Sequence, residues 1–178
     1  MASRDVRGCL IFILLFVKVM SSDDIALGPL QISNMLIKMI SVTPFRFQTR
    51  IRFIDTDASG RIHYTAMFRY FESAEIEFMR SLGVTYAARE LDFPRVHVEC
   101  DFYVPMVHDD LIDIEVCLTK LGRSSARLEF RTLKGDAVAA KGVIVIVCVN
   151  KRTQQSIPIP ADLRAKLESV ASAPQAQE

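Results

Sequence analysis

The stretch Asp55-Thr56-Asp57-Ala58-Ser59-Gly60-Arg61-Ile62-His63-Tyr64 joins a strand-like segment to a long apolar helix, and the rest of the chain is arranged around it. It concentrates two carboxylates, a glycine, a histidine and a tyrosine within ten residues. On its N-terminal side, apolar and polar side chains alternate from residue 45 to 53. This period of two predicts a half-buried strand whose inward side chains are Phe45, Phe47, Ile51 and Phe53.

On the C-terminal side of the stretch, the sequence predicts a helix over residues 65–82. Apolar side chains recur three or four residues apart, at Met67, Phe71, Ala74, Phe78 and Leu82. Polar side chains are confined to a narrow stripe, so we expect other structure to enclose most of this helix. Thr65 is the expected N-cap, and Gly83 stands where a C-terminal cap belongs.

Four more strand-like segments follow, over residues 96–104, 111–121, 126–133 and 137–150. The last of them are joined by short turns, which favours antiparallel hairpins. A short amphipathic helix is predicted over residues 161–170. A sheet that must cover one apolar helix curls around it, and this predicts a two-layer α+β domain over residues 44–155. Residues 156–178 would then form the short helix and a disordered tail.

The N-terminal arm, residues 1–43, contains an apolar run over residues 10–17 that is similar to the core of a secretion signal. Lys18 interrupts this run, no clear cleavage site follows, and the run is shorter than the ~20 residues that a spanning helix needs. We therefore expect no membrane association and a functional chain that starts near Met39, in preference to a true signal or anchor. The arm itself is expected to be poorly ordered or loosely helical.

Charge and cysteine usage exclude several classes of site. A formal net charge of +1 gives no support to nucleic-acid binding. The four cysteines form no C-x-x-C pair and the three histidines are scattered, so no metal site is expected. Cys100, Cys117 and Cys148 fall in strand-like runs, where free thiols are usually small buried apolar groups. This usage fits a reducing compartment, and we expect a cytoplasmic protein.

The motifs of the chain resemble those of the hotdog-fold acyl-CoA thioesterases, in the 4-hydroxybenzoyl-CoA thioesterase-like branch that includes the Tol-Pal-associated enzymes. The matching residues are Asp55-Thr56-Asp57-Ala58-Ser59-Gly60, Tyr64, Arg69-Tyr70-Phe71-Glu72-Ser73-Ala74, Phe102-Tyr103-Val104-Pro105 and Asp109-Asp110. The resemblance covers about residues 44–155. It implies a hotdog fold, with an antiparallel five-stranded sheet wrapped around one long central helix. It also implies hydrolysis of an acyl- or aryl-CoA to the free acid and CoA, by homodimers or homotetramers with sites at the subunit interface.

The same resemblance makes Asp57 the catalytic carboxylate, acting either as a general base or as a nucleophile. The backbone N–H groups near Tyr64, Thr65 and Ala66, at the positive end of the helix, would polarise the thioester carbonyl. The residues alone also allow a different interpretation of the two aspartates, as turn formers. We assign Asp57 to catalysis and Asp55 to the turn.

Two further side chains are candidates for catalysis. His63 suits proton transfer because its pKa lies near neutrality, although relatives often have Tyr-His where this chain has His63-Tyr64. Glu72 is the rival carboxylate, since another hotdog branch carries its catalytic glutamate on this helix; otherwise it belongs to the polar stripe. No metal is required, and the only coenzyme expected is the CoA of the substrate.

Contacts with CoA are predicted at two places. Gly60 would let the loop turn with a positive φ or let the pantetheine arm approach closely. Arg123, Ser124 and Ser125 suit phosphate or pantetheine binding, the alternative being an ordinary hairpin turn. Two alternative functions stay open: hydrolysis of acyl groups on an acyl carrier protein, and acyl-CoA binding without turnover.

Overall fold

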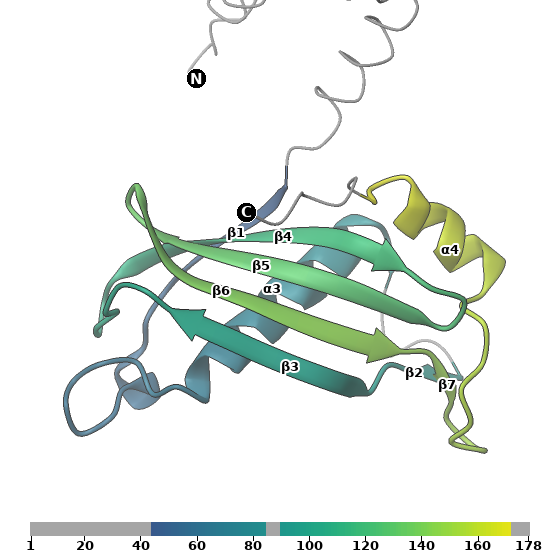
Figure 1. Cartoon of the computed structure of the whole chain (residues 1–178), viewed down its shortest axis with the longest axis horizontal. Coiled ribbons are helices and arrows are strands. Elements are labelled where there is room, and N and C mark those ends of the chain that lie inside the picture. Colours follow the sequence, from purple (N-terminus) through teal and green to yellow (C-terminus); the bar gives the residue numbers. More distant parts are fainter. Residues whose placement is uncertain (1–43, 85–89, 172–178) are drawn as a thin grey trace, which may run out of the picture. The chain divides into compact units, whose positions relative to one another are not determined.

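The computed structural model describes residues 44–84 and 90–171 (Figure 1). In chain order the elements are strand β1 (Phe45–Arg50), a 3-10 turn η1 (Phe53–Asp55), helix α3 (Ala66–Ser81), strands β2 (Leu91–Asp92), β3 (Arg95–Phe102), β4 (Leu111–Leu121), β5 (Ser125–Lys134), β6 (Ala137–Val147) and β7 (Val149–Asn150), and helix α4 (Ala161–Glu168). The predicted arm, residues 1–43, lies outside the described residues, as does the end of the predicted tail. Within the described part, no helix has the length and apolarity needed to cross a membrane.

The five longer strands form one antiparallel sheet in the order β1-β4-β5-β6-β3 (Figure 1). β4, β5 and β6 follow each other as hairpins, as their short turns predict. β1 pairs with β4 at one edge of the sheet, and β3 pairs with β6 at the other. The α+β class and the five-stranded antiparallel sheet are thereby confirmed. The sequence did not predict the separate two-stranded pairing of β2 with β7.

Helix α3 lies against one face of this sheet and contacts β1, β3 and β4 (Figure 1). The ring of Phe71 stacks on Phe130 of β5, with 4.7 Å between the ring centroids. Gly142 of β6 makes room for this ring, because a Cβ atom at that position would lie 2.2 Å from it. The close approach of the helix to the sheet therefore depends on the absence of a side chain at residue 142.

The ends of α3 match the predicted helix to within one residue on each side. At its C-terminus, Gly83 adopts a φ of +65°, which glycine tolerates without strain. The amide of Gly83 donates to the carbonyl of Arg80, and the amide of Val84 donates to the carbonyl of Met79, both at 2.9 Å. This pair of bonds is the Schellman motif, so Gly83 ends the helix as predicted.

Only one side of α3 is covered in the single chain. Eight of its sixteen residues are buried. The side turned away from the sheet is exposed and carries Arg69, Ser73, Ile76 and Arg80.

The prediction that Phe53 faces inward is wrong. β1 ends at Arg50, and the 3-10 turn that begins at Phe53 breaks the alternation of the strand. The side chains of Phe53 and Ile54 are consequently 76% and 82% exposed. The residue of this turn whose side chain is buried is Asp55, which is 1% exposed.

Candidate active site

The loop between the 3-10 turn and α3 is closed by its own backbone. Thr56 and Ile62 form an antiparallel bridge, and the amide of Asp57 donates to the carbonyl of Arg61 at 2.8 Å. Gly60 adopts a φ of +77°, and a Cβ atom there would meet nothing within 4 Å. Backbone conformation, rather than crowding within the chain, therefore accounts for glycine at this position.

Asp57 lies exposed in this loop. Its Oδ1 accepts hydrogen bonds from the hydroxyl of Ser59 at 2.6 Å and from the amide of Ser59 at 2.7 Å. These bonds, the hydroxyl bond foremost, lower the pKa of Asp57 below its ordinary value. The geometry is that of an Asx turn, one of the two interpretations that the sequence allowed. It also presents an exposed, ionised carboxylate at the surface of the loop.

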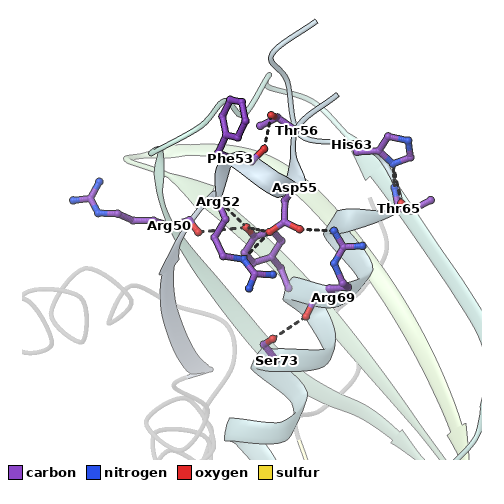
Figure 2. A network of polar contacts seen from close by, with 10 residues as sticks. Arg50, Arg52, Phe53, Asp55, Thr56, His63, Thr65, Arg69 and Ser73 are labelled. Carbon is purple, nitrogen blue, oxygen red and sulfur yellow. Dashed lines mark hydrogen bonds and ion pairs between the residues drawn. The ribbon is translucent and has the colours of Figure 1, made fainter. Parts of the chain in front are cut away.

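Asp55 has a very different environment, at the centre of a polar network (Figure 2). Its Oδ2 accepts hydrogen bonds from Arg52 Nε at 2.8 Å and from the Tyr70 hydroxyl at 2.7 Å, and its Oδ1 pairs with Arg69. Burial alone would raise the pKa of this carboxyl, but the hydrogen bonds, led by that from Arg69, outweigh it and lower the pKa to about 2. The side chain of Asp55 thus does more than close a turn.

His63 and Thr65 bond to each other at the start of α3 (Figure 2). The Nδ1 atom of His63 lies 2.8 Å from the hydroxyl oxygen of Thr65, and the Thr65 amide donates to the same nitrogen at 3.3 Å. Thr65 occupies the N-cap position, as predicted, but its side chain makes no capping hydrogen bond. Its backbone is already helical, and its hydroxyl bonds to the imidazole instead. The His63 ring also stacks on Tyr64, at 4.6 Å between centroids.

The amides expected to polarise a carbonyl are not equivalent. The Ala66 amide donates to the carbonyl of His63 at 2.8 Å and is therefore already used. The Thr65 amide makes only the long contact with His63. Within the described chain, the Tyr64 amide has no hydrogen-bond acceptor. Tyr64 thus supplies the most available backbone donor at the helix start, and its side chain is exposed.

Glu72, the rival carboxylate, lies six residues beyond Ala66, about 9 Å along the helix axis. Its Oε1 is 3.1 Å from Arg95 Nη2 of β3, which also contacts both carboxylate oxygens of the buried Glu75 at 3.3 Å. Arg95 therefore ties this flank of α3 to the edge strand. A catalytic role for Glu72 stays a prediction.

Of the predicted CoA-binding residues, Gly60 lies in the same loop as Asp57, whereas Arg123, Ser124 and Ser125 belong to the connection between β4 and β5, at the other end of the sheet (Figure 1). β4 begins beside Arg50, just before the loop, and ends at the turn that contains Arg123, Ser124 and Ser125. Eleven residues of β4 separate the two ends, which is about 35 Å at the rise of an extended strand. One chain therefore does not bring Asp57 together with Arg123, Ser124 and Ser125.

The turn itself is anchored to the chain on its inner side. Arg164 of α4 donates to the carbonyls of Gly122 and Arg123, and the amide of Cys148 donates to the carbonyl of Ser124 at 2.7 Å. The side chain of Arg123 is exposed, so its guanidinium is open to a ligand.

The thiols and the acidic side chains of the described residues add no metal centre. Burial raises the pKa of Cys100 to about 12 and also raises that of Cys148, so both thiols stay protonated near neutral pH. Over residues 44–84 and 90–171, no group of three or more His, Cys, Asp or Glu side chains is placed to hold a metal ion.

Comparison with known proteins identifies the family. Residues 51–167 match the thioesterase-like superfamily. The chain belongs to that superfamily. Its resemblance to the hotdog-fold thioesterases is thereby confirmed.

Three similar proteins illustrate this thioesterase-like family. A protein of Aquifex aeolicus provisionally named an esterase is 33% identical over 101 residues, which cover 55% of this chain and 79% of that protein. A 1,4-dihydroxy-2-naphthoyl-CoA hydrolase of Synechococcus elongatus is 29% identical over 132 residues, covering 71% and 97% of the two chains. The solved structure of a gentisyl-coenzyme A thioesterase is 27% identical, with a TM-score of 0.64 and coverage of 68% and 98%.

Sequence reasoning about this thioesterase-like chain misses the buried partners of the loop. It assigns Asp55 to a turn and gives no role to Arg52 or Tyr70. One signal is available in the sequence: an acidic residue at an inward position of an alternating segment needs buried donors. The catalytic roles predicted for Asp57, His63 and Tyr64 stay predictions.

Proposed function

We propose that this chain is an acyl-CoA thioesterase, which hydrolyses an acyl- or aryl-CoA to the free acid and CoA. The similar proteins named CoA hydrolases and thioesterases support this substrate class. The observation that carries the proposal is that one loop holds both an exposed, ionised carboxylate, that of Asp57, and an unused backbone amide, that of Tyr64.

The chemistry can follow either of two routes. As a general base, Asp57 removes a proton from water, the water oxygen attacks the thioester carbon, and the C–S bond breaks. As a nucleophile, an Asp57 oxygen attacks the carbon directly, the thiolate leaves, and water then hydrolyses the mixed anhydride. Both routes consume one water and release the acid. In both, the Tyr64 amide would stabilise the negative charge on the carbonyl oxygen.

In this proposal, His63 assists the leaving group. Its Nδ1 accepts the Thr65 amide, so we infer that the neutral ring carries its proton on Nε2. That N–H could donate a hydrogen bond to the departing thiolate of CoA and so stabilise its charge. In the general-base route, the proton that Asp57 takes from water is then available to neutralise the thiolate.

The proposal includes a homodimer, or a homotetramer built from such dimers, because β3 is an open edge. In the described chain β3 pairs only with β6, and it exposes Val96, Val98 and Phe102. An exposed apolar edge strand readily pairs with another strand. Two copies related by a two-fold axis would pair their β3 strands antiparallel. The second subunit would also cover the exposed flank of α3, which would complete the predicted enclosure of a central helix.

This dimer would bring together the residues that one chain separates. The start of β3 and the turn with Arg123 lie at the same end of the sheet, since Arg95 pairs with Ile146 and Ser125 with Val147. Antiparallel pairing puts that end of one subunit beside the loop of the other. We therefore infer that each site combines Asp57 of one subunit with the turn of the other subunit that contains Arg123, Ser124 and Ser125. A cytoplasmic location stays part of the proposal, because Cys100 and Cys148 form no disulfide among the described residues, as in a reducing compartment.

A thiol-release assay over aliphatic and aromatic acyl-CoA substrates tests the function. We expect turnover by the parent protein and a loss of about 100-fold or more in kcat for Asp57→Asn. Asp136→Asn, at an exposed aspartate in the turn between β5 and β6, is the matched control and should keep full activity. Equal activity of Asp57→Asn and parent would refute the catalytic assignment.

The same assay separates the alternatives. Turnover of acyl groups on carrier protein, without turnover of acyl-CoA, would favour the carrier-protein thioesterase. Binding of acyl-CoA with no thiol released from any substrate would favour a non-catalytic binding protein.

A further inference from the structure

The carboxylate of Asp55 connects two parts of the chain that the loop separates (Figure 2). On the side before the loop it binds Arg52, and on the side after the loop it binds Arg69 and Tyr70 of α3. The Tyr70 hydroxyl in turn accepts the Arg52 amide at 2.9 Å. The 3-10 turn is therefore fixed to the N-terminal part of α3 through one buried anion.

The backbone of Asp55 strengthens this connection. Its carbonyl accepts the amide of His63 at 2.8 Å, and its amide donates to the carbonyl of Arg52 at 3.0 Å. Asp55 thus contacts the incoming segment, the outgoing segment and the helix at once. The side chain of Asp57, only two positions away, accepts its hydrogen bonds from Ser59 of its own loop.

We propose that Asp55 is a positioning residue for thioester hydrolysis, because it fixes the loop that carries Asp57 relative to the Tyr64 amide at the start of α3. This inference rests on the function proposed above. Asp55 itself is 1% exposed and its two oxygens are occupied, so it is not available to attack a substrate.

The rest of the loop ties its incoming side to its outgoing side, through the bridge between Thr56 and Ile62 and the bond from the Asp57 amide to the Arg61 carbonyl. Residues 57–61 are exposed. The outgoing side is held separately, by a hydrogen bond of 2.8 Å from the Ile62 amide to the Met106 carbonyl and by the bridge between Arg61 and Val107. Without the Asp55 carboxylate, the segment before Asp57 would lose its ion pair with Arg69 and its carboxylate bond with Tyr70, and it would be held to α3 by the bond from the Arg52 amide to the Tyr70 hydroxyl. The distance between the attacking carboxylate and the carbonyl-binding amide would then vary.

The test uses Asp55→Asn together with Tyr70→Phe, which keeps the ring and removes the hydroxyl that donates to Asp55 and accepts from the Arg52 amide. Glu115→Gln is the matched control. Glu115 is also buried and also binds two arginines, Arg46 at 2.6 Å and Arg131 at 3.1 Å. It lies on the opposite face of β4 from the core residues Ile114 and Val116, away from the loop.

Steady-state kinetics are measured well below the unfolding temperature of each variant. We expect kcat to fall about 100-fold for Asp55→Asn and less for Tyr70→Phe, with KM within about twofold of the parent value, because misplacement of a reacting group affects the chemical step. Glu115→Gln should keep the parent kcat. An unchanged kcat in Asp55→Asn, or an equal loss in Glu115→Gln, would overturn the inference.

Hydrogen exchange separates this inference from the proposed function. Amides over residues 56–65 should exchange faster in folded Asp55→Asn than in the parent, and should be unchanged in Glu115→Gln. If the parent hydrolyses no thioester, the proposed function fails, and exchange alone then decides whether Asp55 positions the loop. Equal protection of these amides in Asp55→Asn and parent would refute it.

Discussion

The hydroxyl of Ser59 and its backbone amide both donate to the same oxygen of Asp57, at 2.6 and 2.7 Å. This pair of hydrogen bonds to one carboxylate oxygen stabilises the ionised form and lowers the pKa of Asp57. By lowering the pKa of Asp57, Ser59 therefore lets the proposed catalytic carboxylate stay charged at a lower pH.

Replacement of Ser59 by alanine removes the hydroxyl bond and keeps the amide bond. The pKa of Asp57 should rise, so the acid limb of the kcat/KM profile should move to higher pH. The profile is measured with one acyl-CoA substrate for parent and Ser59→Ala. Ser73→Ala, on the exposed side of α3, is the control and should leave the limb in place. An acid limb that stays in place or moves down would contradict a catalytic Asp57.

Asp55 should make the stability of the protein depend on acid pH. Its pKa is about 2 in the folded chain against an ordinary value of 3.8, so the unfolded chain binds more protons between these values. The stabilisation from this group is complete above about pH 4 and is lost as the pH falls toward 2. Asp55→Asn should lose about 3 kcal/mol of unfolding free energy at neutral pH and show a flatter acid decline. Urea unfolding at a series of pH values measures both effects, and parallel pH curves for the two proteins would exclude the assignment.

Arg123 should bind the nucleotide part of the substrate. Arg123→Ala should raise KM for acyl-CoA about 10-fold, because a charge-assisted bond to phosphate is lost. The same variant should leave KM unchanged for the corresponding acyl-pantetheine, which lacks the nucleotide phosphates. Arg152→Ala, at another exposed arginine, serves as the control. If both thioesters respond alike, Arg123 does not contact the nucleotide.

The open edge of β3 should hold the subunits together. Val98→Lys puts a charge on this strand, and we expect a monomeric mass in sedimentation velocity together with a loss of thioesterase activity. Leu111→Lys changes an equally exposed residue on β4, which is not an edge strand, and should leave the mass unchanged. A Val98→Lys protein with the mass of the parent would show that β3 does not hold the subunits together.

The fold was largely predictable because its signals are local. The spacing of Met67, Phe71 and Phe78 predicted α3, and Gly83 predicted its end. The prediction failed at Phe53, where a 3-10 turn replaces the last part of the strand. Such a turn has no periodic signal in so short a segment.

The site was less predictable because its contacts are not local. The loop motif pointed to Asp57, Gly60 and the helix start without any knowledge of pairing. The burial of Asp55 depends on donors up to fifteen residues away, on another element. The separation of Arg123 from Asp57 depends on the direction of β4, which is fixed only when its pairing with β1 is known.

The separation of Asp57 from Arg123 within one chain has a genetic consequence. In the proposed dimer, each chain contributes Asp57 to one site and the turn with Arg123 to the other. A mixed dimer of an Asp57→Asn chain and an Arg123→Ala chain would carry both defects in one site and neither in the other. Two damaged alleles could therefore complement each other in one cell, although neither supports full activity alone.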